Sequence, residues 1–149
     1  MKVGVCSRMI AADLIKKDFP KNVSVISFYT PLRGPEPNRF RVDYSEVCDH
    51  VFYVGIPDID ESSFDEYGYS EETYIENASE LADFIFDAKE NGRDIICQCD
   101  FGRSRSAGCA AAILEYFYGC ADKIFLNDKY CPNLMVFEKV FSALHEKIN

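Results

Sequence analysis

The chain lacks any long apolar run. No stretch comes near the ~20 consecutive apolar residues that a membrane-spanning helix needs, and Met1 to Val5 is too short to be a secretory signal peptide. These absences argue against an integral membrane protein and a secreted one. We therefore expect a soluble, cytoplasmic protein.

The chain is also poor in basic residues. It has 16 Lys and Arg against 25 Asp and Glu, which gives a formal net charge of −9. The acids are concentrated between Asp58 and Glu90, where Lys89 is the only base. Such a surface repels nucleic acids and acidic membranes, so we expect neither as a partner. The acidic run itself is explained by a solvated helix face.

Paired cysteine spacings of the metal-binding or disulfide type are absent too. The seven cysteines form an odd number, and Cys97, Cys109 and Cys120 lie within apolar runs. This pattern fits reduced thiols in a cytosol rather than a disulfide framework. We expect no metal and no cofactor.

What is present is an alternation of strands and helices. Apolar, β-branched stretches predict strands over 2–5, 23–28, 50–56 and 94–99. Helical periodicity predicts helices beginning after Ser7 and covering 71–91, 105–118 and 134–148, the last capped by Asn133 and carrying Ile148 on its apolar side. The alternation predicts one α/β domain over residues 1–149, with a mostly parallel sheet of four to five strands and helices on both faces. Ligands bind beyond the carboxyl ends of such strands.

The most informative stretch runs from Ile95 to Gly108. It predicts a buried strand, a tight loop from Cys99 to Arg105 and the start of a helix. Backbone N–H groups and the helix dipole at such a loop attract an anion and lower the pKa of a thiol there. Arg105 can fold over the loop and bind a phosphate dianion with its planar guanidinium. The chemistry implied is phosphoryl transfer to the sulfur of Cys99.

The spacing Cys-x-x-Gly-x-x-Arg-Ser after an apolar strand resembles the signature loop of the protein tyrosine phosphatase superfamily. The size of the chain and its opening Cys6-Ser7-Arg8 resemble the dual-specificity branch, in particular its small bacterial or phage members. The resemblance implies that Cys99 is the nucleophile and that Ser106 stabilises it as a leaving group. It also implies a phosphate-binding loop formed by Asp100, Phe101, Gly102, Arg103, Ser104 and Arg105.

A cysteine phosphatase needs a general acid for the leaving oxygen. Residues Tyr53 to Asp60 resemble the stretch in which the catalytic aspartate follows an Ile-Pro pair by three residues, and this register selects Asp60. Asp58 is the alternative, because bacterial relatives tend to carry two or more acids here, and Asp65 ranks third. The separation between Asp60 and Cys99 is longer than is usual in the family.

Two features leave alternatives open. Gln98 stands where the family has a histidine that keeps the thiol ionised, and a glutamine brings no positive charge. Arg33, Arg39 and Arg41 cluster around a proline-rich loop, where they either solvate the surface or face an anionic ligand.

The expected function is metal-free hydrolysis of phosphotyrosine, and of phosphoserine or phosphothreonine, by a monomeric enzyme acting on a phosphorylated protein or a small phosphomonoester. One alternative is a weak or catalytically silent phospho-binding module. The other is a phosphatase of a non-protein phosphomonoester, against which the acidic Asp100 and the net charge of −9 argue.

Overall fold

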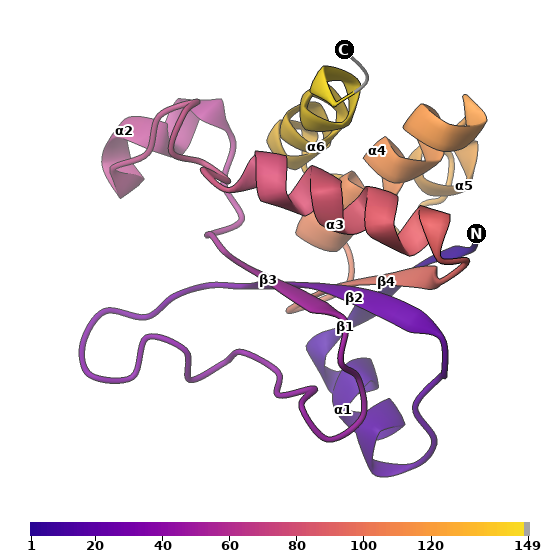
Figure 1. The fold of residues 1–149 in the computed structure, drawn as a ribbon. Helices are drawn as coiled ribbons and strands as arrows, with labels where there is room; N and C mark the ends of the chain where they lie inside the picture. Colours follow the sequence, from indigo (N-terminus) through magenta and orange to yellow (C-terminus); the bar gives the residue numbers. More distant parts are fainter. Residues whose placement is uncertain (148–149) are drawn as a thin grey trace.

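The computed structural model describes residues 1–147 and contains a sheet of four parallel strands (Figure 1). The strands are β1 (Val3–Ser7), β2 (Val23–Tyr29), β3 (Val51–Gly55) and β4 (Asp94–Cys99), in the order β1-β4-β2-β3. β4 pairs with β1 on one side and β2 on the other. The predicted α/β class is confirmed, with four strands rather than five and all of them parallel.

Helices cover both faces of this sheet, as expected (Figure 1). One face carries α1 (Arg8–Lys16), which the Ser7 hydroxyl caps by accepting from the N–H of Ile10. The other face carries α3 (Ala78–Glu90), α4 (Arg105–Tyr118) and α6 (Leu134–Glu146), with the short α5 (Asp122–Phe125) beside α4. The β1–β4–α4 arrangement brings the end of β4 to the middle of the molecule, because β4 is an inner strand.

Helix α4 is the most deeply buried helix of the described chain. All its residues from Arg105 to Ile113 are buried, because small alanines and Gly108 let neighbouring segments approach closely. A Cβ at Gly108 would lie 2.4 Å from the carbonyl oxygen of Asn133. The start of α6 therefore rests directly on the first turn of α4, and Asn133 caps α6 as predicted. Ile148, expected on the apolar side of this helix, lies outside the described residues.

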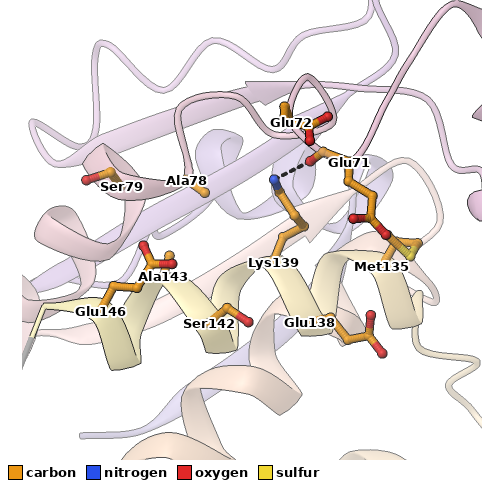
Figure 2. Close-up of a pocket in the computed structure, with 10 residues that line it drawn as sticks. All are labelled: Glu71, Glu72, Ala78, Ser79, Met135, Glu138, Lys139, Ser142, Ala143 and Glu146. Carbon is orange, nitrogen blue, oxygen red and sulfur yellow. Dashed lines mark hydrogen bonds between the residues drawn. The ribbon is translucent and has the colours of Figure 1, made fainter.

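The predicted helix over 71–91 is wrong in its first third. Residues 71–77 form turns, and α3 begins only at Ala78. The reason is local: Ile75 adopts a left-handed backbone with φ of 58°, which no α-helix accepts, while Tyr74 is completely buried. Lys139 of α6 donates to the carbonyl of Glu71, so this turn segment lies against α6 across a shallow acidic pocket (Figure 2).

The sequence patterns also gave no sign of two short elements that precede this segment. A 3₁₀ turn, η1 (Glu61–Ser63), leads into α2 (Phe64–Tyr67), which ends at Gly68 in a left-handed conformation. Phe64 is buried and contacts the ring of Tyr74, with centroids 5.1 Å apart. These elements account for the long separation between the predicted acid and Cys99.

Candidate active site

The loop between β4 and α4 is clamped by backbone contacts on two sides. Gly102 has φ of +64°, and a Cβ on it would lie 2.6 Å from the carbonyl carbon of Cys6 and the amide nitrogen of Ser7. Only glycine fits there, since both the conformation and the space exclude a side chain. The N–H of Arg8 donates to the carbonyl of Asp100 at 3.2 Å. The loop is thus fixed against the junction of β1 and α1.

The other side of the loop is fixed by the segment before α6. The N–H of Asn133 donates to the carbonyl of Ser104 at 3.0 Å, and the N–H of Cys131 donates to that of Arg103 at 2.9 Å. Ser104 occupies the N-cap position of α4, but its side chain does not cap the helix. A helix N-terminus without a side-chain cap keeps its amide donors for an anion.

Cys99 lies at the base of this loop with its sulfur 3.0 Å from the hydroxyl oxygen of Ser106. Burial alone would raise the pKa of the thiol. The hydrogen bonds from the side chain and backbone of Ser106 and from the backbone of Arg103, together with the charge of Arg105, outweigh burial and lower the pKa below the ordinary thiol value. At Cys6, by contrast, burial and the nearby Cys99 raise the pKa to about 11. Of these two thiols, Cys99 is the one whose pKa lies below the ordinary value.

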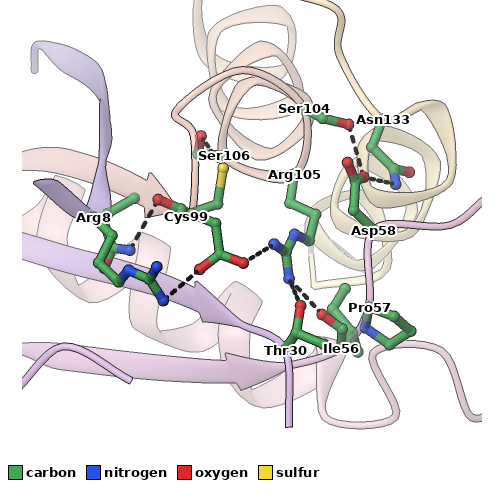
Figure 3. Close-up of polar contacts among 12 residues, drawn as sticks. Arg8, Thr30, Ile56, Pro57, Asp58, Cys99, Ser104, Arg105, Ser106 and Asn133 are labelled. Carbon is green, nitrogen blue, oxygen red and sulfur yellow. Dashed lines mark hydrogen bonds and ion pairs between the residues drawn. The ribbon is translucent and has the colours of Figure 1, made fainter. Parts of the chain in front are cut away.

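Arg105 is 3% exposed and reaches across the carboxyl ends of three strands (Figure 3). Its Nη1 donates to the Thr30 hydroxyl at 2.9 Å and to the carbonyl of Ile56 at 2.6 Å, and its Nη2 donates to Asp100 at 3.0 Å. Its Nε has no partner within the part of the chain that the structure describes. We call the loop from Cys99 to Arg105 the phosphate-type loop, after the signature loop that its spacing resembles. A buried N–H without a partner, on a cation at the end of this loop, suits an anionic ligand.

Asp100 lies between two arginines. One of its carboxylate oxygens is 3.0 Å from Nη2 of Arg105, and the other is 3.4 Å from Nη1 of Arg8 on α1. Its side chain therefore turns toward the arginines that it neutralises. Phe101, the next residue of the loop, is 86% exposed.

Gln98 stands at the position where the family has a histidine. It is buried and belongs to a network of neutral hydrogen-bonding groups. Its Oε1 accepts from the hydroxyls of Ser27 and Tyr44, both at 2.6 Å, and its Nε2 donates to the carbonyl of Cys99 at 3.1 Å. The amide thus orients the start of the loop through hydrogen bonds, without a charge. Gln98 is 1% exposed, so its amide is closed off from solvent.

Of the three acids considered, Asp58 contacts the phosphate-type loop. Its Oδ1 accepts from the Ser104 hydroxyl at 2.7 Å and from Nδ2 of Asn133 at 2.9 Å (Figure 3). Nδ2 of Asn133 also donates to the carbonyl of Ile59 at 3.0 Å. Asp58 and Asn133 therefore hold the segment after β3 against the loop.

Asp60 and Asp65 are placed differently. Among residues 1–147, the Asp60 carboxylate bonds only to Ser62, at the start of η1. It accepts hydrogen bonds from the N–H and the hydroxyl of Ser62. Asp65 lies in α2, farther along the same connection. The structure brings together Cys99, Arg105 and Ser106, and brings Asp58 to Ser104, whereas Asp60 lies two residues beyond this anchored contact.

Three residues of the site could not be found by sequence reasoning. Thr30 and Tyr44 come from a loop whose direction no periodicity fixes, and both bond to residues far away in the chain. Asn133 was predicted as a helix cap, and that role is confirmed, but its contacts with Asp58 and Ser104 were not foreseen. The one available signal was its Pro-Asn position at the start of a helix.

Two further observations bear on cofactors and membranes. Residues 1–147 hold no group of three or more His, Cys, Asp or Glu side chains arranged to bind a metal ion. None of the described helices combines the length and the apolarity that crossing a bilayer requires.

Comparison with known proteins reveals a shared fold without sequence similarity. No protein-family model and no curated protein matches the sequence. The structure is similar to that of human DUSP28, with a TM-score of 0.57 and 15% identity over 98% of this chain and 93% of that chain. It is also similar to a human tyrosine phosphatase-like serine/threonine/tyrosine-interacting protein, with a TM-score of 0.56 and 14% identity over 97% and 88%.

A third similar structure is that of PTPMT1 in complex with PI(5)P, with a TM-score of 0.56 and 15% identity over 97% of this chain and 91% of that chain. At these identities the similarity establishes the fold. The fold that the loop resemblance implied is therefore confirmed.

The lowered pKa of Cys99 predicts that its thiol is alkylated at a lower pH than an ordinary thiol. Because the thiolate is the reactive form, its fraction at pH 7 should exceed the ~3% of an ordinary thiol. The rate of iodoacetate labelling at Cys99, followed by mass spectrometry across pH, should give an apparent pKa below the ordinary value of ~8.5. Ser106→Ala should raise that pKa, since it removes a hydrogen bond to the sulfur. An apparent pKa at or above ~8.5 in the unmodified protein would contradict activation by the loop.

The Gln98 network predicts a stability difference between two variants. Gln98→Leu leaves the buried hydroxyls of Ser27 and Tyr44 without their acceptor, and each unsatisfied group costs about 1–3 kcal/mol. We expect urea unfolding to show a loss of roughly 3 kcal/mol. Tyr44→Phe, the matched control, removes one donor and leaves Gln98 bonded to Ser27, so about 1 kcal/mol is expected. Equal losses in the two variants would show that the amide is not the centre of the network.

Proposed function

We propose that this chain, which has the fold of the dual-specificity branch of the cysteine-based protein tyrosine phosphatase superfamily, hydrolyses phosphomonoesters through a phosphocysteine on Cys99. The observation that carries the proposal is the pairing in one loop of a thiol with a lowered pKa and a buried arginine whose Nε–H has no partner in residues 1–147. A phosphate held by the loop amides and Arg105 would place its phosphorus before the Cys99 sulfur.

In the first step the Cys99 thiolate attacks phosphorus, a sulfur–phosphorus bond forms and the bond to the ester oxygen breaks. A protonated carboxyl group gives its proton to the leaving oxygen, so an alcohol or phenol departs. In the second step the same group, now a carboxylate, takes a proton from water, whose oxygen attacks phosphorus and releases phosphate and the thiolate. The Ser106 hydroxyl, 3.0 Å from the sulfur, stabilises the thiolate as it leaves.

The carboxyl group comes from the connection after β3. Asp60 is our choice for the general acid: it has the register that the loop resemblance implies, and its only described partner is the neighbouring Ser62. Asp58 is held by Ser104 and Asn133, a role that positions the connection on the loop. Proton transfer by Asp58 is the alternative, and the two assignments give different kinetics.

We propose phosphotyrosine in a protein as the main substrate, with phosphoserine and phosphothreonine as secondary ones. The fold alone does not decide this, since similar structures include one with bound PI(5)P and one of a phosphatase-like interacting protein. The support comes from this chain: Asp100 places a carboxylate inside the loop, and the net charge of −9 disfavours ligands with many phosphates.

The mechanism predicts that replacing the Cys99 thiol by a hydroxyl abolishes turnover. Hydrolysis of a small aryl phosphate in the presence of EDTA should proceed in the unmodified protein and fall at least about 10³-fold in Cys99→Ser, because the alcohol is a far poorer nucleophile at neutral pH. Cys120→Ser, a change at an exposed thiol outside the site, is the control. Activity that survives in Cys99→Ser, or that requires a metal, would refute the mechanism. A protein that binds the phosphate but never turns it over would be the phospho-binding module.

The choice between the two acids predicts a dependence on the leaving group. Asp60→Asn keeps an acceptor for Ser62 but cannot give a proton, so kcat/KM should fall about 10²-fold or more for a phenol that leaves poorly. The fall should be much smaller for an activated aryl phosphate, and the basic limb of the pH profile should flatten. Asp58→Asn should show a smaller loss that is equal for both substrates. The reverse pattern would make Asp58 the acid.

A further inference from the structure

A groove with an excess of positive charge lies between α1 and the segment that follows the proline-rich loop. It has a volume of about 430 Å³. Four bases line it against one acid, although acids outnumber bases 25 to 16 in the whole chain. The residues that matter are Arg8, Lys16, Arg39, Phe40, Arg41 and Asp43.

Two arginines of this groove, Arg39 and Arg41, have no acidic partner among the described residues, whereas Arg8 is paired with Asp100. The guanidinium carbon of Arg8 lies 4.8 Å from the ring centre of Phe40, and that of Arg41 lies 4.4 Å from the ring centre of Tyr53. Within residues 1–147, Arg39 and Arg41 form no ion pair. Stacking on an aromatic face orders the Arg41 side chain and leaves its guanidinium N–H groups without an acidic partner among residues 1–147.

The single acid of the groove does not cancel this charge. The carboxylate of Asp43 accepts from the N–H of Ser45 at 2.9 Å, and this contact lowers the pKa of Asp43 more than Arg41 does. Asp43 therefore bonds along its own turn and forms no ion pair with Arg41.

The groove is connected directly to the phosphate-type loop. Arg8 lines the groove; its backbone N–H also donates to the carbonyl of Asp100, and its guanidinium forms an ion pair with the Asp100 carboxylate. Asp100 in turn bonds to Arg105. A group bound in the groove is thus one side chain, that of Arg8, away from the loop that would hold the phosphoester.

The opposite side of the loop has the opposite charge. A second groove of about 770 Å³ is lined by Ser104 of the loop and by five acids with no Lys or Arg. These acids are Asp58, Asp60, Glu61, Glu66 and Glu138. The loop therefore lies between a basic and an acidic groove, and a ligand crossing it meets a reversal of charge.

We propose that the basic groove binds acidic side chains on one side of the phosphorylated residue in a peptide substrate, and that the acidic groove rejects them on the other side. This inference rests on the proposed phosphatase function and specifies its substrate. A peptide fits the observation because its flanks can differ in charge. An anionic membrane would present the same charge to both grooves and would be repelled by the five acids.

The experiment compares three phosphotyrosine peptides: one with glutamates before and lysines after the phosphotyrosine, one with the order reversed, and one with glutamines on both sides. Phosphate release is measured at low ionic strength. We expect one of the two charged peptides to exceed the other about five-fold in kcat/KM, which corresponds to one or two exposed ion pairs. The preference should shrink in 0.5 M NaCl, because salt screens such pairs.

Arg39→Gln/Arg41→Gln should remove this preference, whereas Lys21→Gln/Lys123→Gln, which changes the net charge equally at exposed sites outside both grooves, should keep it. Arg8 is left unchanged because it contacts the loop. Equal rates for the two charged peptides, or a preference that survives in Arg39→Gln/Arg41→Gln, would overturn the inference.

An aryl phosphate without flanks separates the two proposals. If it is hydrolysed while the peptides show no preference, the groove assignment fails and the phosphatase function stands. If it is not hydrolysed, the function fails, and fluorescence anisotropy of the same peptides with Cys99→Ser still decides the groove by the difference in Kd. Salt-sensitive sedimentation with phosphatidylserine vesicles that is lost in Arg39→Gln/Arg41→Gln, without any peptide preference, would assign the groove to a membrane and overturn the inference.

Discussion

The buried guanidinium of Arg105 is the constraint on which the rest of the site depends. A charge that is 3% exposed is tolerated only where partners surround it, because an uncompensated buried charge costs several kcal/mol. Those partners come from separate places: Thr30 just after β2, Ile56 just after β3 and Asp100 just after β4. One side chain thereby ties together the carboxyl ends of three parallel strands, which is the edge where such sheets bind ligands.

The charges around Arg105 also limit what the loop can hold. Arg8 and Arg105 contribute two positive charges, and the shared Asp100 carboxylate removes one. In the proposed reaction this excess of one positive charge would face a thiolate and an incoming phosphate dianion, so the backbone amides at the start of α4 would have to supply much of the attraction. An acid inside the loop thus favours a ligand with one phosphate. The rest of such a ligand would have to be bound by groups outside the loop.

The parts of this structure that local sequence determines were predictable, and the parts that distant contacts determine were not. Cys99, Gly102 and Arg105 lie within seven residues, so their spacing alone indicated the strand, the tight loop and the helix. The contact between Gln98 and Tyr44 joins residues 54 apart in the chain, and no periodicity reveals it. The helix expected from Glu71 failed for the same reason. The apolar spacing of Tyr74 and Ala78 suits a helix, but Tyr74 instead donates from its hydroxyl to the carbonyl of Pro57 at 2.9 Å, and Ile75 takes a left-handed backbone.

The turn segment 71–77, which does not form the expected helix, also helps to hold the connection after β3 in place. The carbonyl of Pro57 is held by Tyr74, the side chain of Asp58 by Ser104 and Asn133, and the carbonyl of Ile59 by Asn133 again. Three consecutive residues are therefore fixed to the frame that also carries Cys99, the proposed nucleophile. Asp60 is the first residue beyond this anchored stretch, and its carboxylate bonds only to Ser62 among residues 1–147. If Asp60 is the general acid, it can move toward a leaving group through a change in backbone conformation from Asp60 onward. The contacts that hold residues 57–59 against the loop then stay intact.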